Sequence, residues 1–183
     1  MTHRQPRPAA FLDRDGVLNH DIDYVHRPED FRWIDGAQAA VKRLNDAGYY
    51  VIVVTNQSGV ARGYFEETAV HRLHSWINDE LRGSGAHIDA FYHCPYHPEG
   101  KVEAYRRHSE DRKPGPGMLL CAKREWPIDW AHSFLIGDKE SDMQAAAAAG
   151  VPGYLFRGGN LREFLEANVL GGLQSGQIIP TDR

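Results

Sequence analysis

The stretch AAFLDRDGV at residues 9–17 joins an apolar run to two carboxylates. An uninterrupted apolar run of this kind is typical of a β-strand that is buried on both faces, as in a parallel sheet. Asp13 and Asp15 follow directly, so we expect both at the carboxyl end of that strand. Two anions so close repel each other and raise one pKa unless a cation such as Mg²⁺ lies between them. One carboxylate could then attack phosphorus while the other transfers a proton. The pair alone is a weak signal, because it is common in ordinary loops.

Length and composition indicate a single domain. The chain has 183 residues, of which 42% are hydrophobic and 25% charged, the usual proportions of a soluble protein. Its net charge of −4 argues against a nucleic-acid-binding protein, which relies on clustered Lys and Arg. Residues 1–8 lack the apolar region of a signal peptide, and no apolar stretch is long enough to span a bilayer. Only Cys94 and Cys121 are present, too few for a disulfide framework, so we expect a cytoplasmic location and no membrane partner.

Apolar runs alternate with helical patterns along the chain. Strands are predicted at residues 9–12, 50–54, 88–92 and 134–137, and helices at 36–47, 66–81, 114–123 and 140–149. Strand and helix in alternation predict an α/β fold with a doubly wound parallel sheet. Ligands of such sheets bind outside the carboxyl ends of the strands, where Asp13, Thr55 and Asp138 would gather. Residues 19–34 and 94–112 are predicted to be loop excursions, and residues 168–183 a loosely held tail.

Four motifs follow one another in the chain: DRDGV at 13–17, TNQSG at 55–59, RKP at 112–114 and GDKESD at 137–142. Their order and spacing resemble the motifs of haloacid dehalogenase-superfamily phosphatases, and the resemblance covers residues 11–155. Within that superfamily the chain is most similar to the heptose 1,7-bisphosphate phosphatases and the related histidinol-phosphate phosphatases. Residues 21–26, 57–63, 94–98, 112–118 and 142–146 carry this finer likeness. It implies a Rossmann-like fold without a large cap domain.

The resemblance also implies a division of labour at the strand ends. Asp13 would be the nucleophile and form an aspartyl-phosphate, and Asp15 would act first as general acid and then as general base. Thr55 and Lys113 would bind the phosphoryl oxygens. Asp138 would hold Mg²⁺ together with Asp13 and the backbone carbonyl of Asp15. Mg²⁺ and Lys113 would offset the repulsion between a dianionic ester and these carboxylates.

Other residues in the matching segments are candidates for binding the rest of the substrate. Arg112 suits a second phosphate because its planar guanidinium can bind in a bidentate manner, although it could also be a solvated surface charge. Lys139 is a second candidate, or it could simply pair with Asp138 or Glu140. The remaining candidates in the matching segments are Asp21, Tyr24, Asn56, Gln57 and Ser58.

The chain departs from its subgroup in one loop. Members commonly hold a structural zinc there with Cys-x-His followed by Cys-x-Cys. Here Cys94 is kept, but Tyr96, Ser109 and Asp111 stand at the other three positions. One thiolate among poor ligands should not hold the ion, so we expect no structural zinc. A different set could be made by Cys94 and Asp111 with three nearby histidines, His93, His97 and His108.

Three functions are compatible with these features. The first is a Mg²⁺-dependent phosphatase that removes the 7-phosphate of D-glycero-D-manno-heptose 1,7-bisphosphate. The second is a phosphatase for histidinol phosphate or for small phosphorylated metabolites in general. The third, a domain that binds phosphosugars without turnover, is disfavoured because nucleophile, acid/base, lysine and metal-binding acid are all present. The expected partner is a phosphorylated small molecule, and the expected state is a monomer.

Overall fold

A parallel five-stranded sheet forms the centre of the protein, whose computed structural model describes residues 5–171. The strand order is β3-β2-β1-β4-β5, so the first strand of the chain occupies the middle of the sheet. The strands are β1 (Ala9–Leu12), β2 (Tyr50–Asn56), β3 (Ala90–Cys94), β4 (Phe134–Gly137) and β5 (Gly153–Leu155). Each neighbouring pair is parallel, which confirms the predicted fold class.

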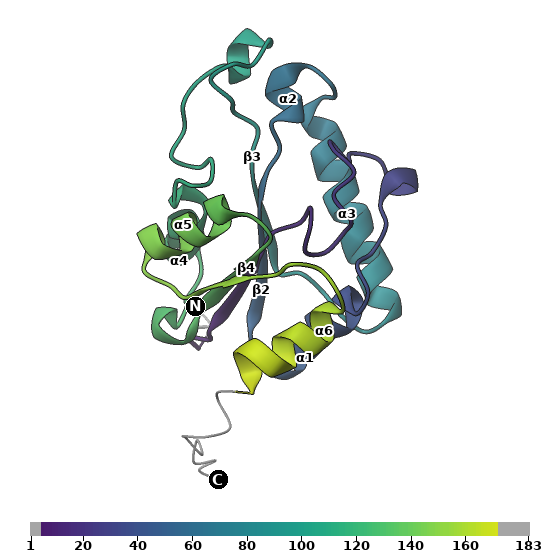
Figure 1. Ribbon diagram of the computed structural model, residues 1–183, viewed down its shortest axis with the longest axis vertical. Coiled ribbons are helices and arrows are strands. Elements are labelled where there is room, and N and C mark those ends of the chain that lie inside the picture. The colour runs from purple at the N-terminus through teal and green to yellow at the C-terminus, as the bar shows by residue number, and fades with distance from the viewer. Residues whose placement is uncertain (1–4, 172–183) are drawn as a thin grey trace.

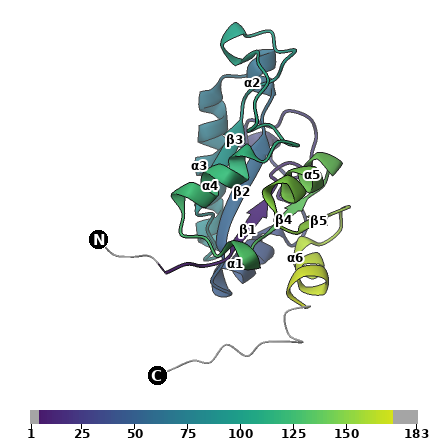
Figure 2. The ribbon, with the colours of Figure 1, turned by 90° about the vertical axis from the view of Figure 1, so that its left-hand side faces the viewer.

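Helices cover both faces of this sheet (Figures 1 and 2). On one face lie α1 (Ala37–Asp46), α3 (Glu67–Gly83) and α6 (Leu161–Leu165), and on the other lie α4 (Gly117–Glu125) and α5 (Glu140–Ala149). The shorter helical segments are η1 (Pro28–Asp30), α2 (Gly59–Arg62), η2 (Glu103–Tyr105), η3 (Trp130–His132) and the π-helical η4 (Glu166–Leu170). Residues 19–34 and 94–112 add no second sheet, so within the described chain they are loops on the main domain.

The apolar run of β1 contributes side chains to the core on both faces of the sheet. Because successive side chains of a strand point to opposite sides, Ala10 and Leu12 pack toward α1 and α3, whereas Ala9 and Phe11 pack toward α4 and α5. All four residues are fully buried. A continuous apolar run without alternation is therefore what a central strand between two helical layers requires.

The observed boundaries differ from the predicted ones where the sequence pattern is weak. β3 begins two residues later than predicted, and α4 begins at Gly117 instead of residue 114. β5 and α6 were not predicted, since elements this short show no clear periodicity. The prediction of a loose tail from residue 168 was wrong at its start, because Val169 and Leu170 belong to η4 and are buried in the core. Residues 172–183 lie outside the described part.

The strand order has a topological switch point beside β1, where successive strands are added on opposite sides of the sheet. After β1 the chain builds β2 and β3 on one side, and it then returns to build β4 and β5 on the other. Loops at the carboxyl ends of β1 and β4 therefore diverge and leave a crevice. Gly16 lies in this crevice with φ of +87°, and a Cβ there would meet the carboxylate of Asp138 at 2.2 Å. Glycine is thus required where the loop after β1 passes the loop after β4.

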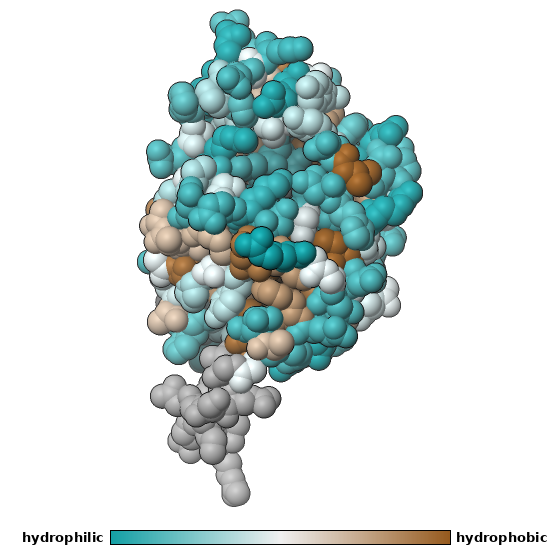
Figure 3. Space-filling view, in the orientation of Figure 1, coloured by the Kyte–Doolittle hydropathy of each residue, from teal (hydrophilic) through white to brown (hydrophobic). Residues whose placement is uncertain are grey.

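The surface seen in Figure 3 is mostly hydrophilic, with hydrophobic residues gathered mainly in its lower half. Among residues 5–171, no helix combines the length and the apolar character needed to cross a membrane. Exposed large hydrophobic side chains among these residues are Ile22, Tyr24 and Tyr64.

Candidate active site

A cleft of about 420 Å³ opens at the carboxyl ends of the strands. Asp13 follows β1, Thr55 lies near the end of β2, and Lys113 precedes α4. All predicted site residues except Asp138 line this cleft: Asp13, Asp15, Asp21, Tyr24, Thr55, Asn56, Gln57, Ser58, Arg112, Lys113 and Lys139. The fold therefore brings together residues that are up to 126 positions apart in the chain, between Asp13 and Lys139.

Lys113 is the charged centre at the floor of the cleft. Its Nζ lies 3.0 Å from Asp13 Oδ1 and 2.5 Å from Asp142 Oδ1, and it donates a hydrogen bond to the carbonyl of Val54 at 3.0 Å. Burial by itself would lower the pKa of Lys113, but the two carboxylates outweigh it and the pKa is raised. Lys113 is therefore held as an ammonium next to Asp13.

Burial destabilises the ionised form of Asp13 by more than the nearby Lys113 stabilises it. Burial raises the pKa of Asp13 to about 7, since the attraction of Lys113 is opposed by the negative charges of Asp142 and Asp15. One ammonium facing two buried carboxylates cannot neutralise both. The site accordingly has one negative charge in excess, and it would be stabilised by a further cation.

Asp138 provides a second indication of a cation. Its carboxylate, with those of Asp13 and Asp142, contributes oxygens that all lie within 4.8 Å of one another. Asp138 Oδ1 is buried without a hydrogen-bond partner, and burial raises the pKa of this carboxyl. Oxygen ligands of this kind suit Mg²⁺, which prefers carboxylates and water. These residues therefore fit the magnesium ion that the motifs imply, with Asp142 as an additional ligand candidate.

Asp15 is fixed by a network that the sequence did not reveal. The guanidinium of Arg14, fully buried, donates to both oxygens of Asp15 through Nη2 at 3.1 and 3.0 Å and also to the carbonyl of Val25 at 2.6 Å. Asn19 Nδ2 and Gln57 Nε2 donate to the same carboxylate at 3.0 and 2.9 Å. Asp15 is thus oriented at the cleft, as an acid/base group must be.

The residues at the end of β2 have different tasks. Gln57 Nε2 donates to Thr55 Oγ1 at 2.9 Å and so connects Thr55 to Asp15. Asn56 exchanges two hydrogen bonds of 3.0 Å with the backbone of Lys113. Asn56, predicted to bind substrate, therefore uses both ends of its amide to position the segment that carries Lys113. Ser58 precedes α2 and lines the cleft.

Charged side chains of both signs lie at the mouth of the cleft, among them Arg112, Lys139 and Asp21. Lys139 Nζ lies 2.9 Å from Asp21 Oδ2, so Lys139 pairs with Asp21 and not only with its neighbours in sequence. Partial burial would lower the pKa of Lys139, but Asp21 outweighs it and the pKa is raised. Arg112 is half-buried, and its Nη1 is buried without a hydrogen-bond partner.

Tyr24 packs edge-on against Tyr64 with ring centroids 4.7 Å apart.

The loop that lacks the zinc pattern packs by other contacts. Cys94 is buried in the apolar core between the sheet and α4. Tyr96 stands at one of the zinc-ligand positions of the subgroup. The guanidinium carbon of Arg107 lies 3.7 Å from the centroid of the Tyr96 ring. His93 turns toward Glu67, and His97 Nε2 lies 3.3 Å from Arg62 Nη2. The absence of a loop zinc stays a prediction.

Sequence reasoning assigned no role to Asp142, Arg14 or Asn19. Asp142 lies in the quoted motif at 137–142, four residues after Asp138, and this spacing was the available signal. Its carboxylate also accepts a hydrogen bond from the backbone N–H of Lys139 at 3.0 Å and so caps α5. Arg14 is adjacent to Asp15 in the chain, but its burial and its contacts with Val25 and His74 depend on how separate segments pack, so no local pattern indicates its role.

Comparisons with known proteins identify relatives of this chain. Residues 111–169 match a family model described as HAD-hydrolase-like. A D-glycero-beta-D-manno-heptose-1,7-bisphosphate 7-phosphatase of Rhodopseudomonas palustris is 53% identical over 167 residues, which cover 91% of this chain and 93% of that protein. The enzyme of the same name from Escherichia coli K12 is 48% identical over 144 residues, 79% of this chain and 75% of that protein.

Solved structures show the same relationship. A putative HAD-like phosphatase from Mesorhizobium loti superposes with a TM-score of 0.79 at 39% identity, covering 85% of this chain and 75% of that one. The D,D-heptose 1,7-bisphosphate phosphatase from B. bronchiseptica, complexed with magnesium and phosphate, gives a TM-score of 0.73 at 34% identity and 88% coverage of both chains. The chain therefore belongs to the haloacid dehalogenase-like hydrolases, and within them to the family of heptose bisphosphate phosphatases that these relatives represent.

Proposed function

We propose that this phosphatase hydrolyses D-glycero-D-manno-heptose 1,7-bisphosphate at the 7-position, with Mg²⁺ as cofactor. The observation that carries the proposal is the buried Asp13–Lys113–Asp142 group beside Asp138, at the floor of a cleft lined with further cations. The substrate is proposed from relatives up to 53% identical that bear this activity in their names.

The first half-reaction is assigned to Asp13 and Asp15. A carboxylate oxygen of Asp13 attacks phosphorus, the bond from phosphorus to the sugar oxygen breaks, and Asp15 protonates the departing oxygen. Lys113, 3.0 Å from Asp13, and the hydroxyl of Thr55 bind phosphoryl oxygens. When bound, Mg²⁺ neutralises the carboxylates and the phosphoryl group; Asp13, Asp138 and Asp142 would hold it, and the Asp15 carbonyl stays a predicted ligand.

The second half-reaction releases phosphate. Asp15, now ionised, removes a proton from a water molecule, the oxygen attacks phosphorus, and the bond from phosphorus to Asp13 breaks. Both roles require Asp15 to stay in one orientation while its proton is exchanged. The hydrogen bonds from Arg14, Asn19 and Gln57 supply this restraint.

A bisphosphate is favoured over a monophosphate by the mouth of the cleft. Arg112 has a buried Nη1 without a partner, which is costly unless an anion accepts its hydrogen bond. Lys139 lines the same cleft and is held by Asp21. We assign the second phosphate of the substrate to these two cations. Histidinol phosphate has no group for this place.

The test compares kcat/KM for heptose 1,7-bisphosphate, histidinol phosphate and a panel of sugar monophosphates in the presence of Mg²⁺. Arg112→Gln should lower kcat/KM for the bisphosphate about 10- to 100-fold, the worth of a hydrogen bond to a charged group, and affect monophosphates much less. Arg106→Gln, an exposed arginine of the same loop, serves as the control.

Three outcomes would redirect the proposal. A preference below about tenfold for the bisphosphate removes the heptose assignment. Equal losses with all substrates would make Arg112 a general structural residue. Faster turnover of histidinol phosphate would favour the second function named above. The monomeric state and the cytoplasmic location stay predictions.

A further inference from the structure

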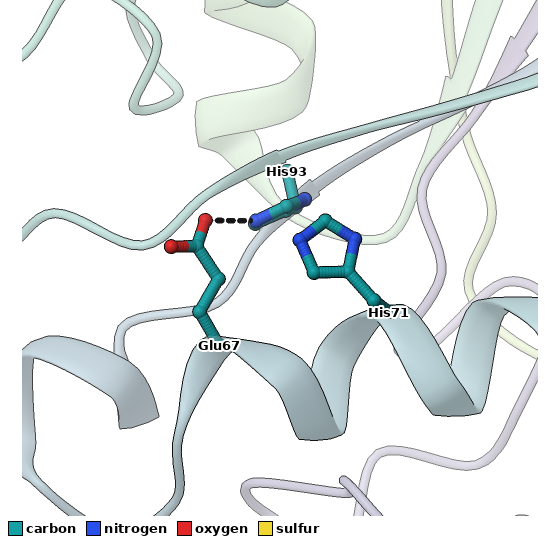
Figure 4. Close-up of side chains that lie close together, drawn as sticks. All are labelled: Glu67, His71 and His93. Atoms are coloured by element: carbon teal, nitrogen blue, oxygen red, sulfur yellow. Dashed lines mark hydrogen bonds and ion pairs between the residues drawn. The ribbon is translucent and has the colours of Figure 1, made fainter.

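A second cluster of metal-binding side chains lies outside the active-site cleft. Glu67, His71 and His93 offer ligand atoms that all lie within 4.8 Å of one another. None of the three lines the cleft that contains Asp13. Figure 4 shows Glu67 and His71 on the same side of α3, with the His93 ring reaching toward them from β3. The cluster therefore joins a helix to the strand beside it.

The positions of the three residues follow from regular structure. Glu67 and His71 are four residues apart in α3, so their side chains point the same way one turn apart. His93 lies at the carboxyl end of β3, and its Nε2 is 2.6 Å from Glu67 Oε1. The rings of His71 and His93 are nearly perpendicular, at 84°, with centroids 5.0 Å apart. Two ligands are therefore already adjacent, and the third needs only a small side-chain rotation.

The distances are close to those of a zinc site. With Zn–N and Zn–O bonds of about 2.0–2.2 Å, tetrahedral ligand atoms lie about 3.4 Å apart. The three ligand atoms already lie within 4.8 Å of one another, and the 2.6 Å between His93 Nε2 and Glu67 Oε1 would lengthen by about 0.8 Å when an ion binds. His71 is exposed, so its ring is free to turn toward the other two ligands. Glu67 and His93 are half-buried and provide the fixed part of the site.

The surroundings support a ligand at this place. Tyr105 in η2 donates to Glu67 Oε2 at 2.9 Å, which orients the carboxylate and leaves Oε1 directed at His93. Such contacts from outside the ligand set are typical of metal sites. Glu67, His71 and Tyr105 also line an open cleft of about 600 Å³, which gives an ion and its water access from solvent.

We propose that Glu67, His71 and His93 bind one Zn²⁺ or a similar late first-row divalent ion, with water in the fourth position. Two imidazole nitrogens and one carboxylate oxygen match zinc, whereas Mg²⁺ prefers oxygen ligands alone. The ion replaces the hydrogen bond between His93 Nε2 and Glu67 Oε1, and the neutral His93 ring binds it through Nε2 with its single ring proton on Nδ1. It would fasten β3 to α3 just before the loop at 94–112. This ligand set shares only His93 with those considered for a loop zinc.

The test is a zinc titration of chelator-washed protein with saturating Mg²⁺ present, so that the carboxylates at Asp13 are occupied. Calorimetry should give one zinc per chain for the wild type. His71→Ala should weaken binding at least 100-fold, and Tyr105→Phe, which removes only the orienting hydrogen bond, by about 10- to 100-fold. Zinc should also raise the unfolding temperature of the wild type and not that of His71→Ala.

Control variants separate this site from the alternatives. His108→Ala and Cys94→Ser should bind zinc as the wild type does, because neither residue belongs to the cluster. The proposal fails if the wild type takes up no zinc, or if all variants bind it equally. It also fails if binding survives His71→Ala and is lost in His108→Ala or Cys94→Ser, which would place the ion in the loop. Without zinc, His71→Ala should unfold near the wild-type temperature, since the side chain is exposed.

Discussion

Lowering the pH from about 8 to about 6 should weaken Mg²⁺ binding about tenfold. Burial raises the pKa of Asp13 to about 7, and the carboxyl must lose its proton before it can bind the ion. The apparent dissociation constant then scales as 1 + 10^(pKa − pH), which is about 1.1 at pH 8 and about 11 at pH 6. Asp138, whose pKa is also raised by burial, should make the dependence steeper.

The same shift determines how the metal-free protein responds to pH. The folded-state pKa of Asp13 lies above its unfolded value of about 3.9, so folding retains a proton that the unfolded chain has lost. This contribution to stability is complete below about pH 4 and is lost as the pH rises through about 7. Mg²⁺ removes the repulsion that remains, so it should raise the unfolding temperature more at pH 8 than at pH 6.

Calorimetric Mg²⁺ titrations across this pH range, without substrate, measure the effect directly. Asp142→Asn removes one of the charges that raise the pKa of Asp13, so the pH at which affinity falls should move downward. Asp129→Asn, a carboxylate that pairs with exposed His132, should leave that pH unchanged. An affinity that changes less than twofold between pH 8 and 6, or an unmoved midpoint in Asp142→Asn, would refute this explanation.

Three further variants test separate parts of the molecule. Asp13→Asn should reduce phosphate release by about 10⁴-fold or more with unchanged circular dichroism, and retained turnover would mean that another residue is the nucleophile. Arg14→Met should lower the free energy of unfolding in urea by about 3–5 kcal/mol, because it leaves buried hydrogen-bond partners unpaired. It should also lower kcat, because Asp15 is no longer held in place. A stable, fully active variant would contradict both roles. Leu165→Ala should cost about 2–5 kcal/mol because Leu165 is fully buried in α6, while kcat of the folded enzyme stays unchanged; no loss of stability would show that α6 contributes little to the core.

The sequence determined the architecture because its signals are local. A continuous apolar run such as residues 9–12 is typical of a strand buried on both faces, and the spacing in residues 140–149 matches one helix, α5. The order of the four motifs placed Asp13, Thr55 and Asp138 at neighbouring strand ends. β5 and α6 were not predicted, because three and five residues are too few to show a hydrophobic periodicity.

Tertiary structure decided which side chains act together. Asp142 faces Lys113, Asn56 holds the backbone of Lys113, and Arg14 reaches Val25, each across a separation that no local pattern encodes. Glu67 and His93 meet only because β3 packs beside α3. Local periodicity determines whether a segment forms a helix or a strand. Strand order and loop packing depend on contacts between distant segments. The pKa values and ion pairs of a site depend on those same contacts. For that reason the proposed catalytic pair, Asp13 and Asp15, could be found in the sequence, whereas the balance of charge around it and the cluster of Glu67, His71 and His93 became visible only in the folded protein.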